Sequence, residues 1–339
     1  MRHKRVFFPL MIAAAVICLS ISAGLWLARN QLKADQNPAL GQNQPQQGQD
    51  DGNGFNGTIL VDGQNYQYRE GLKTILFLGV DQSPEDTTDG VIGTGGRSDT
   101  ILLFLLDEAT RTTQVLELSR DTMVNVDVYN STGDYAYSGK MQLAMQYAFG
   151  KTPRISCRLT REKVAELLYG VKIDACLSLT MDAIPELIDT LGGLELTFDR
   201  DYTYVDPAFV QGTTLRMNGQ QAFDFVHYRD TAQQGSNEDR MDRQQLILRA
   251  LSHQIRRSED SDAAVLTLWK AAEPYLQSDL SVEELQAWAE YDLVEPWYQL
   301  PGQSVAGQLH DEFYVDEQAL QDLVIQLFYE TASEPVFDR

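Results

Sequence analysis

The sequence predicts an α/β fold in which a central mixed β-sheet is covered by helices on both faces, after an N-terminal transmembrane helix. In the segments 74–80 and 101–106 the apolar residues do not alternate with polar ones. Strands of this kind are covered on both faces, so helices must lie on either side of the sheet. Strand-like and helical segments alternate along the chain, which is typical of α/β proteins. The transmembrane helix is predicted from an uncharged apolar stretch at residues 6–28.

The N-terminus carries a topological signal. Arg2, Lys4 and Arg5 precede the apolar stretch, and such positive residues stay in the cytoplasm. A cleaved signal peptide is the alternative, but the stretch is longer than a usual signal core and has no convincing A-x-A cleavage site. We therefore interpret it as an uncleaved signal-anchor. This predicts a single-pass membrane protein with a short cytoplasmic segment, 1–5, and everything after the anchor outside the cell.

The composition of the exported part indicates three segments. Residues 29–65 are rich in Gln, Asn, Gly and Asp, which predicts a flexible extracellular linker. Residues 66–258 form the main domain. Residues 259–339 contain two helical stretches, 281–291 and 316–329, and are expected to pack as a helical part on the same domain. The chain of 339 residues has 27 basic and 49 acidic residues, a net charge of −22, which argues against a nucleic-acid partner.

The elements of the main domain follow from local signals. Thr160 is a helix N-cap candidate and Gly170 a stop signal, while Gly192-Gly193 ends the next helix. Ser236 and Asp239 have capping-box spacing before the longest helical pattern. After the two buried strands we expect helices at 141–149, 160–169, 182–191, 219–225 and 236–256, and strands at 173–179 and 194–198.

Several other chemistries are set aside, and one covalent feature stays open. Four scattered histidines and the lack of a Cys-x-x-Cys pair argue against zinc. No Gly-x-Ser-x-Gly or P-loop sequence occurs. Cys157 and Cys176 are the only cysteines of the exported part, where a disulfide is permitted, but two buried free thiols fit the sequence as well.

Two Arg-Asp signatures are the candidate functional feature. They are Gly-Arg-Ser-Asp-Thr at 96–100 and Ser-Arg-Asp-Thr at 119–122. A β-hairpin whose turn is centred between Ala109 and Thr110 sets Asp99 opposite Arg120, roughly 5 Å apart between Cα atoms. The cluster suits a phosphate group with a divalent metal, because arginine forks grip phosphate and carboxylates hold Mg²⁺. Structural salt bridges at a hairpin end are the alternative. The four charged residues are Arg97, Asp99, Arg120 and Asp121.

The long helical segment supplies further cations. Arg240, Arg243 and Gln244 have the spacing that places them on one helix face, within the first two turns, where a helix favours anions. The alternative is a solvated basic face neutralised by nearby acidic residues. Lys140, expected at a helix start, and Arg229 could join either arrangement.

The chain resembles the LytR-CpsA-Psr (LCP) proteins of bacteria, from about Lys73 to Ser258. Six segments match the family's signatures in the family's order. They are 75–81 with 96–100, 118–122 (Leu-Ser-Arg-Asp-Thr), 191–194 (Leu-Gly-Gly-Leu), 215–222 (Leu-Arg-Met-Asn-Gly-Gln-Gln-Ala), Tyr228-Arg229 and 240–245. The membrane anchor and the extracellular placement also resemble the family.

The resemblance implies an activity and a set of roles. LCP proteins are phosphotransferases that move a glycopolymer from a polyprenyl-pyrophosphate carrier to peptidoglycan through a phosphodiester, and residues 66–258 would be the catalytic domain. Asp99, Arg120 and Asp121 would act in catalysis, with Asp99 or Asp121 accepting the proton of the attacking hydroxyl. Mg²⁺ would be held by Asp81 and Asp99. The pyrophosphate would be bound by Arg97, Arg120, Lys140, Arg229, Arg240, Arg243 and Gln244, with Gln245 as the alternative amide.

One departure from the family pattern leaves other functions open. His227 stands where the family often has an arginine. A non-catalytic extracellular binder of polyprenyl-phosphate lipid or cell-wall polymer is therefore the main alternative. A transcriptional attenuator disagrees with the predicted topology, because only about five residues would remain in the cytoplasm.

Overall fold

The computed structural model describes residues 58–61, 63–81, 92–93, 96–228, 230, 236–256, 261–281, 284, 291–307 and 310–332. The predicted signal-anchor at 6–28 lies outside these residues, as does most of the predicted linker. No helix within the described ranges is long and apolar enough to cross a membrane.

A seven-stranded sheet forms the centre of the molecule. Its strand order is β11-β8-β3-β4-β5-β12, and β13 also pairs with β5. β3 and β8 are parallel, as are β5 and β12, whereas β3–β4 and β4–β5 are antiparallel, so the predicted mixed sheet is confirmed. The strands are β3 (Leu72–Val80), β4 (Ser98–Asp107), β5 (Thr112–Leu118), β8 (Ala175–Thr180), β11 (Leu276–Ser278), β12 (Asp292–Leu293) and β13 (Tyr298–Gln299).

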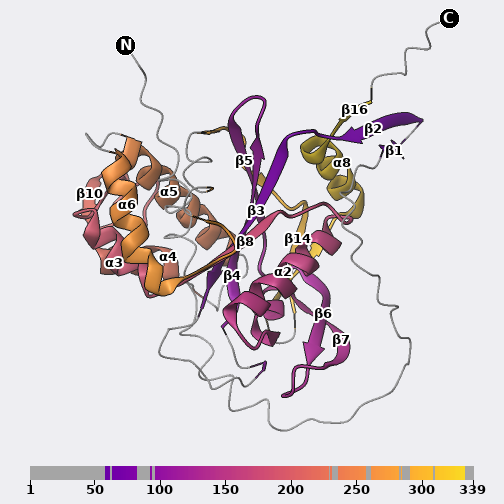
Figure 1. Cartoon of the computed structure of the whole chain (residues 1–339). Coiled ribbons are helices and arrows are strands. Elements are labelled where there is room, and N and C mark those ends of the chain that lie inside the picture. The colour runs from indigo at the N-terminus through magenta and orange to yellow at the C-terminus, as the bar shows by residue number, and fades with distance from the viewer. Residues whose placement is uncertain are drawn as a thin grey trace, which may run out of the picture.

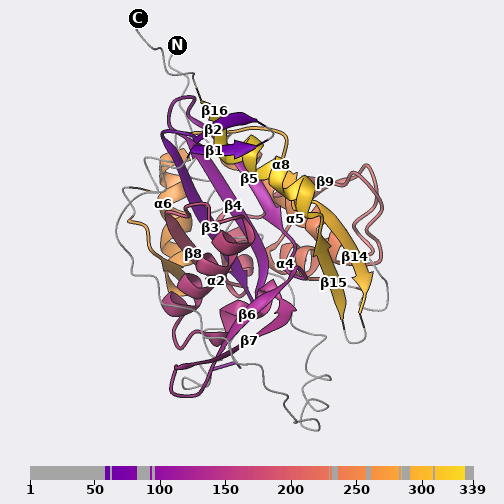
Figure 2. The ribbon, with the colours of Figure 1, turned by 90° about the vertical axis from the view of Figure 1, so that its right-hand side faces the viewer.

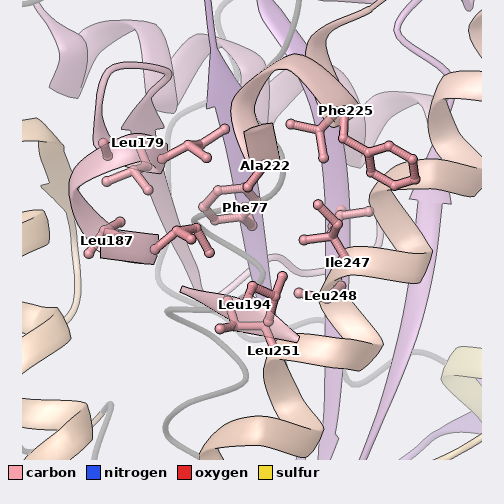
Figure 3. Packing of buried hydrophobic residues seen from close by; sticks show 14 of the residues in the cluster. Phe77, Leu179, Leu187, Leu194, Ala222, Phe225, Ile247, Leu248 and Leu251 are labelled. Atoms are coloured by element: carbon pink, nitrogen blue, oxygen red, sulfur yellow. The ribbon is translucent and has the colours of Figure 1, made fainter. Parts of the chain in front are cut away.

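The central strands are buried on both faces, as their unbroken apolar runs predict. Alternate residues of one strand enter different hydrophobic cores. Phe77 and Leu102 pack with the helices on one side, whereas Leu76 and Leu103 pack on the other. Figure 1 shows the two helical layers with the sheet between them. Figure 3 shows the first core, where Phe77 lies among apolar side chains that include Leu179, Leu187, Leu194 and Leu248.

Each layer has its own helices. The first contains α3 (Ala183–Thr190), α4 (Gly219–His227), α5 (Ser236–Arg256) and α6 (Ser261–Ala272). The second contains the 3₁₀ segment η3 (Leu143–Phe149), α2 (Pro153–Leu167) and α8 (Glu317–Phe328). In Figure 2, α2 lies across the front of the sheet.

Most helix positions agree with the sequence, but the start of α2 does not. α2 begins at Pro153, and the hydroxyl of Thr152 accepts a hydrogen bond from the backbone N–H of Ile155 at 3.3 Å. Thr160 is a buried interior residue whose hydroxyl donates to the carbonyl of Ser156 at 2.9 Å. A threonine hydroxyl can either cap a helix N-terminus or donate to the carbonyl four residues earlier inside a helix. The residue type alone therefore does not identify the helix start, and the predicted start at Thr160 is wrong. α5 has the predicted bounds.

The Asn-Gly-Gln-Gln motif is a structural device. Asn218 and Gln221 form a capping box at the start of α4, each side chain bonding the other's backbone N–H. Gly219 lies so close to α3 that a Cβ atom would be 2.2 Å from the carbonyl oxygen of Pro185. This motif therefore fixes the contact between α3 and α4.

The segment 259–339 differs from the expected helical part. The helix expected at 281–291 lies largely outside the described residues. Short strands instead extend the sheets: β11, β12 and β13 join the central sheet, and β16 (Tyr329–Thr331) pairs with β2 (Gln64–Tyr68). β14 (Gly302–Ala306) and β15 (Asp311–Val315) form a hairpin. Packing on the main domain is thus achieved by strand pairing as well as by α6 and α8.

Strands also occur at the end of the predicted linker and beside the sheet. β1 (Thr58–Val61) pairs with β2, so residues from 58 onward are not linker. β6 (Met123–Tyr129) and β7 (Tyr135–Gln142) form a hairpin directly after the second Arg-Asp signature, and β9 (Leu194–Thr197) pairs with β10 (Thr214–Met217). Cys157 and Cys176 are buried free thiols.

One buried side chain of β5 is ionisable although its neighbours along the strand are apolar. Glu117 of β5 faces α5 and is only 2% exposed. Its Oε2 accepts hydrogen bonds from Gln245 Nε2 at 2.8 Å and from Gln299 Nε2 at 3.3 Å. Leu102, Leu248 and Trp297 help to line the narrow pocket around it. Burial raises the pKa of Glu117 to about 7, although the two amide donors and Arg240 oppose the shift.

This burial predicts a pH-dependent stability. The raised pKa means that neutral Glu117 stabilises the fold fully below about pH 4.5, and the contribution is lost as the pH rises through about 7. Over this range the loss is roughly 3 kcal/mol. Glu117→Gln, which removes the charge, should therefore raise the melting temperature much more at about pH 8 than at about pH 5.

Thermal unfolding at the two pH values, followed by circular dichroism, measures this effect. Glu108→Gln, in the exposed turn between β4 and β5, is the matched control and should show no such difference. An equal change in melting temperature at both pH values would contradict a buried ionisable Glu117.

Candidate active site

The ends of three neighbouring strands bring the Arg-Asp signatures together. Asp81 follows β3, and its backbone N–H donates to the carbonyl of Arg97 at 2.9 Å. In the β4–β5 pairing Ile101 is opposite Leu118. Extending this register by two residues places Asp99 opposite Arg120, as the hairpin centre predicts. The structure confirms the prediction, because Arg120 Nη1 lies 2.8 Å from Asp99 Oδ1.

Arg120 is the central cation of this cluster. It is 4% exposed, and its Nε lies 3.6 Å from Asp121 Oδ1. Burial opposes its charge, but the carboxylates of Asp99, Asp121 and Asp81 outweigh burial and raise the pKa of Arg120. The guanidinium is therefore held charged at the end of the sheet.

Asp99 is the least satisfied group of the cluster. It is 3% exposed, and neither carboxylate oxygen accepts a hydrogen bond from the residues that the structure describes. Its contact with Arg120 is one of charge, without hydrogen-bond geometry. Burial raises the pKa of Asp99 even though Arg120, Arg240 and Arg97 all act to lower it. An additional cation at these oxygens would compensate the buried carboxylate.

Asp121 is held more firmly than Asp99. Gln142 at the end of β7 donates to Asp121 Oδ1 at 2.6 Å and to the carbonyl of Asp311 at 3.0 Å. The backbone N–H of Phe313 in β15 donates to the carbonyl of Asp121 at 2.9 Å. The hairpin β6–β7 thus fixes the carboxylate of Asp121, and the C-terminal strand β15 fixes its backbone. Gln142 was not expected in the site from the sequence.

The first turns of α5 dock onto the cluster. Arg240 is fully buried, and its Nη2 donates to Asn237 Oδ1 at 2.5 Å and to the carbonyl of Asp99 at 3.4 Å. Asn237 Nδ2 in turn donates to Ser119 Oγ at 3.2 Å. One turn later, the hydroxyl of Thr100 donates to Gln244 Oε1 at 3.3 Å.

Arg243 is enclosed by aromatic side chains. Its guanidinium lies about 6 Å from the ring centroids of Tyr204, Phe225 and Tyr228. It also forms an ion pair with Asp239 at 3.2 Å and donates to the hydroxyl of Tyr204 and the carbonyl of Tyr228. Arg243 and Arg240 are both 0% exposed, so the solvated basic face is ruled out for these two residues.

The remaining predicted residues differ in placement. Arg97 is half-buried beside the cluster, and burial together with Arg120 lowers its pKa. Lys140 lies exposed on β7, not at the start of a helix. Arg229 lies outside the described residues. His227 is half-buried and stacked on Phe223, and burial and Arg240 lower its pKa, so it is neutral at physiological pH and adds no cation.

The residues fit a divalent cation. No group of three or more His, Cys, Asp or Glu side chains with metal-site spacing occurs in the described part of the chain. Mg²⁺, however, is usually held by one or two carboxylates together with substrate phosphates. The buried oxygens of Asp99, which lack a hydrogen-bond donor among the described residues, are ligands of this kind, with Asp81 at the adjacent strand end.

Comparison with known sequences gives consistent relatives. The polyisoprenyl-teichoic acid–peptidoglycan teichoic acid transferase TagU of Bacillus subtilis is 25% identical over 178 residues, 52% of this chain and 50% of that protein. TagU of Halalkalibacterium halodurans is 28% identical over 181 residues, 53% of this chain and 52% of that protein. The chain thus matches about half the length of these curated relatives.

Solved structures show the same fold. The crystal structure of B. subtilis TagV matches with a TM-score of 0.56 at 22% identity, over 76% of this chain and 96% of that chain. The structure of TagT bound to LI-WTA matches with a TM-score of 0.55 at 20% identity, over 76% of this chain and 90% of that chain. A sequence model of the LytR_cpsA_psr family matches residues 28–300, and since this is most of the chain, the protein belongs to that family.

Proposed function

We propose that the protein is a membrane-anchored, Mg²⁺-dependent phosphotransferase that attaches a glycopolymer from a polyprenyl-pyrophosphate carrier to peptidoglycan outside the cell. Family membership and relatives named as teichoic acid transferases support a transfer reaction of this class. The observation that carries the proposal is the buried carboxylate of Asp99 among Arg97, Arg120 and Arg240. Three cations around a carboxylate that accepts no hydrogen bond from the described residues form a site for a metal-bound pyrophosphate.

The proposed reaction transfers a phosphoryl group. A peptidoglycan hydroxyl oxygen attacks the phosphorus that carries the polymer, and the bond to the lipid-linked phosphate breaks, releasing polyprenyl phosphate. The hydroxyl proton would pass to the carboxylate of Asp99 or Asp121. Asp81 and Asp99 would hold Mg²⁺, which supplies positive charge against the phosphate oxygens. Phosphoryl transfer gains most from such charge neutralisation.

The arginines of the site would bind the pyrophosphate and neutralise its charge. Arg120, already charged and fixed by Asp99 and Asp121, would bind the pyrophosphate through its planar fork. Arg97 and Arg240 add positive charge from the two sides. We propose that Asp121 orients Arg120, because its own Oδ1 is already held by Gln142.

Arg243 needs a different role from the one that the resemblance implies. In the described structure its guanidinium is enclosed by aromatic rings and bonded to the Tyr204 hydroxyl, so a phosphate could reach it only if Tyr204 moved away. We propose that Arg243 holds α5 to α4 and the loop that carries Tyr204. A non-catalytic binder remains the second candidate, since one of the family's cations is enclosed and the neutral His227 does not supply another.

Asp99 gives the first test of catalysis. Asp99→Asn keeps the shape but removes the anionic ligand, so transfer of a lipid-linked polymer to peptidoglycan fragments should fall at least about 100-fold. Binding of Mg²⁺, measured by calorimetry with a pyrophosphate analogue present, should weaken in parallel. Asp107→Asn, at the opposite end of β4, is the matched control. Full transfer by Asp99→Asn would remove Asp99 from the mechanism, and polymer binding without transfer by the parent protein would favour the binder.

Arg120 gives a test of fork geometry. Arg120→Lys retains the charge but loses the two-pronged contact with phosphate. We expect the kcat/KM for transfer to drop at least about tenfold, which corresponds to about 1.4 kcal/mol. Arg69→Lys, where Arg69 pairs with Asp107 away from the site, should retain activity. Unchanged transfer by Arg120→Lys would mean that Arg120 acts only in the fold.

A further inference from the structure

A second group of cations lines a hollow at the edge of the central sheet. α2 contributes Arg154, Arg158 and Arg161, and the edge strand β11 contributes Gln277 and Ser278, followed by Asp279. The hollow is open to solvent and has a volume of about 540 Å³. Figure 2 shows α2 lying over the strands of this face.

The three arginines share one side of α2. Their spacing of four and then three residues places them on one helix face. Ser156, Thr160 and Lys163 are buried on the opposite side of the helix. The three arginines line the same hollow as the residues of β11.

The positive charge of this hollow is only partly compensated. Arg158 pairs with Glu162 at 3.0 Å, but both side chains are more than half exposed, and such pairs hold weakly. Arg161 Nη1 lies 3.3 Å from Asp279 Oδ2, and both residues line the hollow. Arg154 has no acidic partner among the residues described here. Two carboxylates therefore face three guanidinium groups, in a chain with a net charge of −22.

The hollow lies near the candidate active site. Gln277 pairs with Ser178, which pairs with Leu78, so Gln277 lies two strands from β3 and three residues before the level of Asp81. Strand spacing and rise then give a separation of roughly 14 Å between the Cα atoms of Gln277 and Asp81. A polymer chain held at Asp81 could extend to this edge of the sheet.

We propose that this arginine hollow binds successive phosphate groups of a phosphodiester polymer carried by the donor, at a distance from the reacting pyrophosphate. The inference rests on the proposed function. Guanidinium forks match phosphate oxygens in shape and charge, and a series of three suits successive phosphates of one chain. A neutral glycan would gain nothing from these charges, because Arg158 and Arg161 would keep only their weak surface ion pairs.

A binding experiment tests the proposal without requiring transfer. The double variant Arg154→Gln/Arg158→Gln is compared with Arg216→Gln/Arg249→Gln, a control pair of exposed arginines in the other helical layer. Binding of a lipid-free glycerol-phosphate oligomer to the purified full-length protein is measured by fluorescence anisotropy. We expect the Kd to rise at least about tenfold in the hollow variant and to change less than about twofold in the control. Added salt should weaken binding to the parent protein more than binding to the hollow variant.

Three further arms separate the possible ligands. A neutral dextran oligomer of similar length should not bind. Inorganic phosphate should compete only weakly, because one phosphate contacts one part of the hollow. Vesicles containing anionic phosphatidylglycerol should bind parent and hollow variant equally. Equal affinity of the oligomer for parent and hollow variant, binding of dextran as tight as that of the oligomer, or loss of vesicle binding in the hollow variant would each overturn the proposal.

Transfer assays then distinguish this inference from the proposed function. The hollow variant should transfer a lipid-linked donor with a single repeat at the parent rate, but show a higher KM for a donor with many repeats. Transfer with the same KM for the long donor in parent and variant would overturn the hollow while leaving the enzyme proposal intact. Oligomer binding that depends on the hollow, in a protein that transfers nothing, would overturn the enzyme proposal and leave the hollow intact.

Discussion

The burial of charge at the end of the central sheet is the constraint on which the candidate site depends. Arg120 and Asp99 are both almost inaccessible to water, and an uncompensated charge at that depth would cost several kcal/mol. Their mutual contact is insufficient for the carboxylate, because burial still raises the pKa of Asp99. Arg240 adds a further cation from a helix that begins more than a hundred residues later, and the pKa of Asp99 is raised even in its presence. The site therefore exists only when strands and α5 are assembled together.

The position of α5 is set by both apolar and polar contacts. Ile247, Leu248 and Leu251 are buried against the sheet, and burying side chains of this size contributes about 1.5–3 kcal/mol each. Apolar packing alone would tolerate a small slide of the helix. The amides of Gln244 and Gln245 prevent it, because each has a fixed partner on a strand. A shift by one turn would separate these pairs by about 5 Å and move Arg240 away from Asp99.

The sequence predicted what depends on local pattern and failed where distant contacts decide. The apolar runs of β3 and β4 indicated a sheet covered on both sides, and the centre of the β4–β5 turn was enough to place Asp99 opposite Arg120. Asn237 and Tyr204 had no such signal, because their importance comes from contacts with residues 118 and 39 positions away. The short strands of the C-terminal segment are two to five residues long, too short for a periodic pattern. β11, β12, β13 and β16 form because β2, β5 and β8 offer open edges, whereas β14 and β15 pair with each other.

The distribution of positive charge connects the site with the arginine hollow. A chain with 49 acidic and 27 basic residues repels polyanions on average, so an anionic polymer can approach only where cations are concentrated. At the site those cations are buried and balanced by carboxylates, which suits one compact diphosphate. At the edge of the sheet Arg154 and Arg158 are exposed, and the ion pair of Arg158 with Glu162 is weak, which suits a long, mobile chain that must bind and then leave. In the mechanism that we propose, burial thus separates two tasks of arginine side chains: rigid placement of the reacting group, and weak binding of the polymer attached to it.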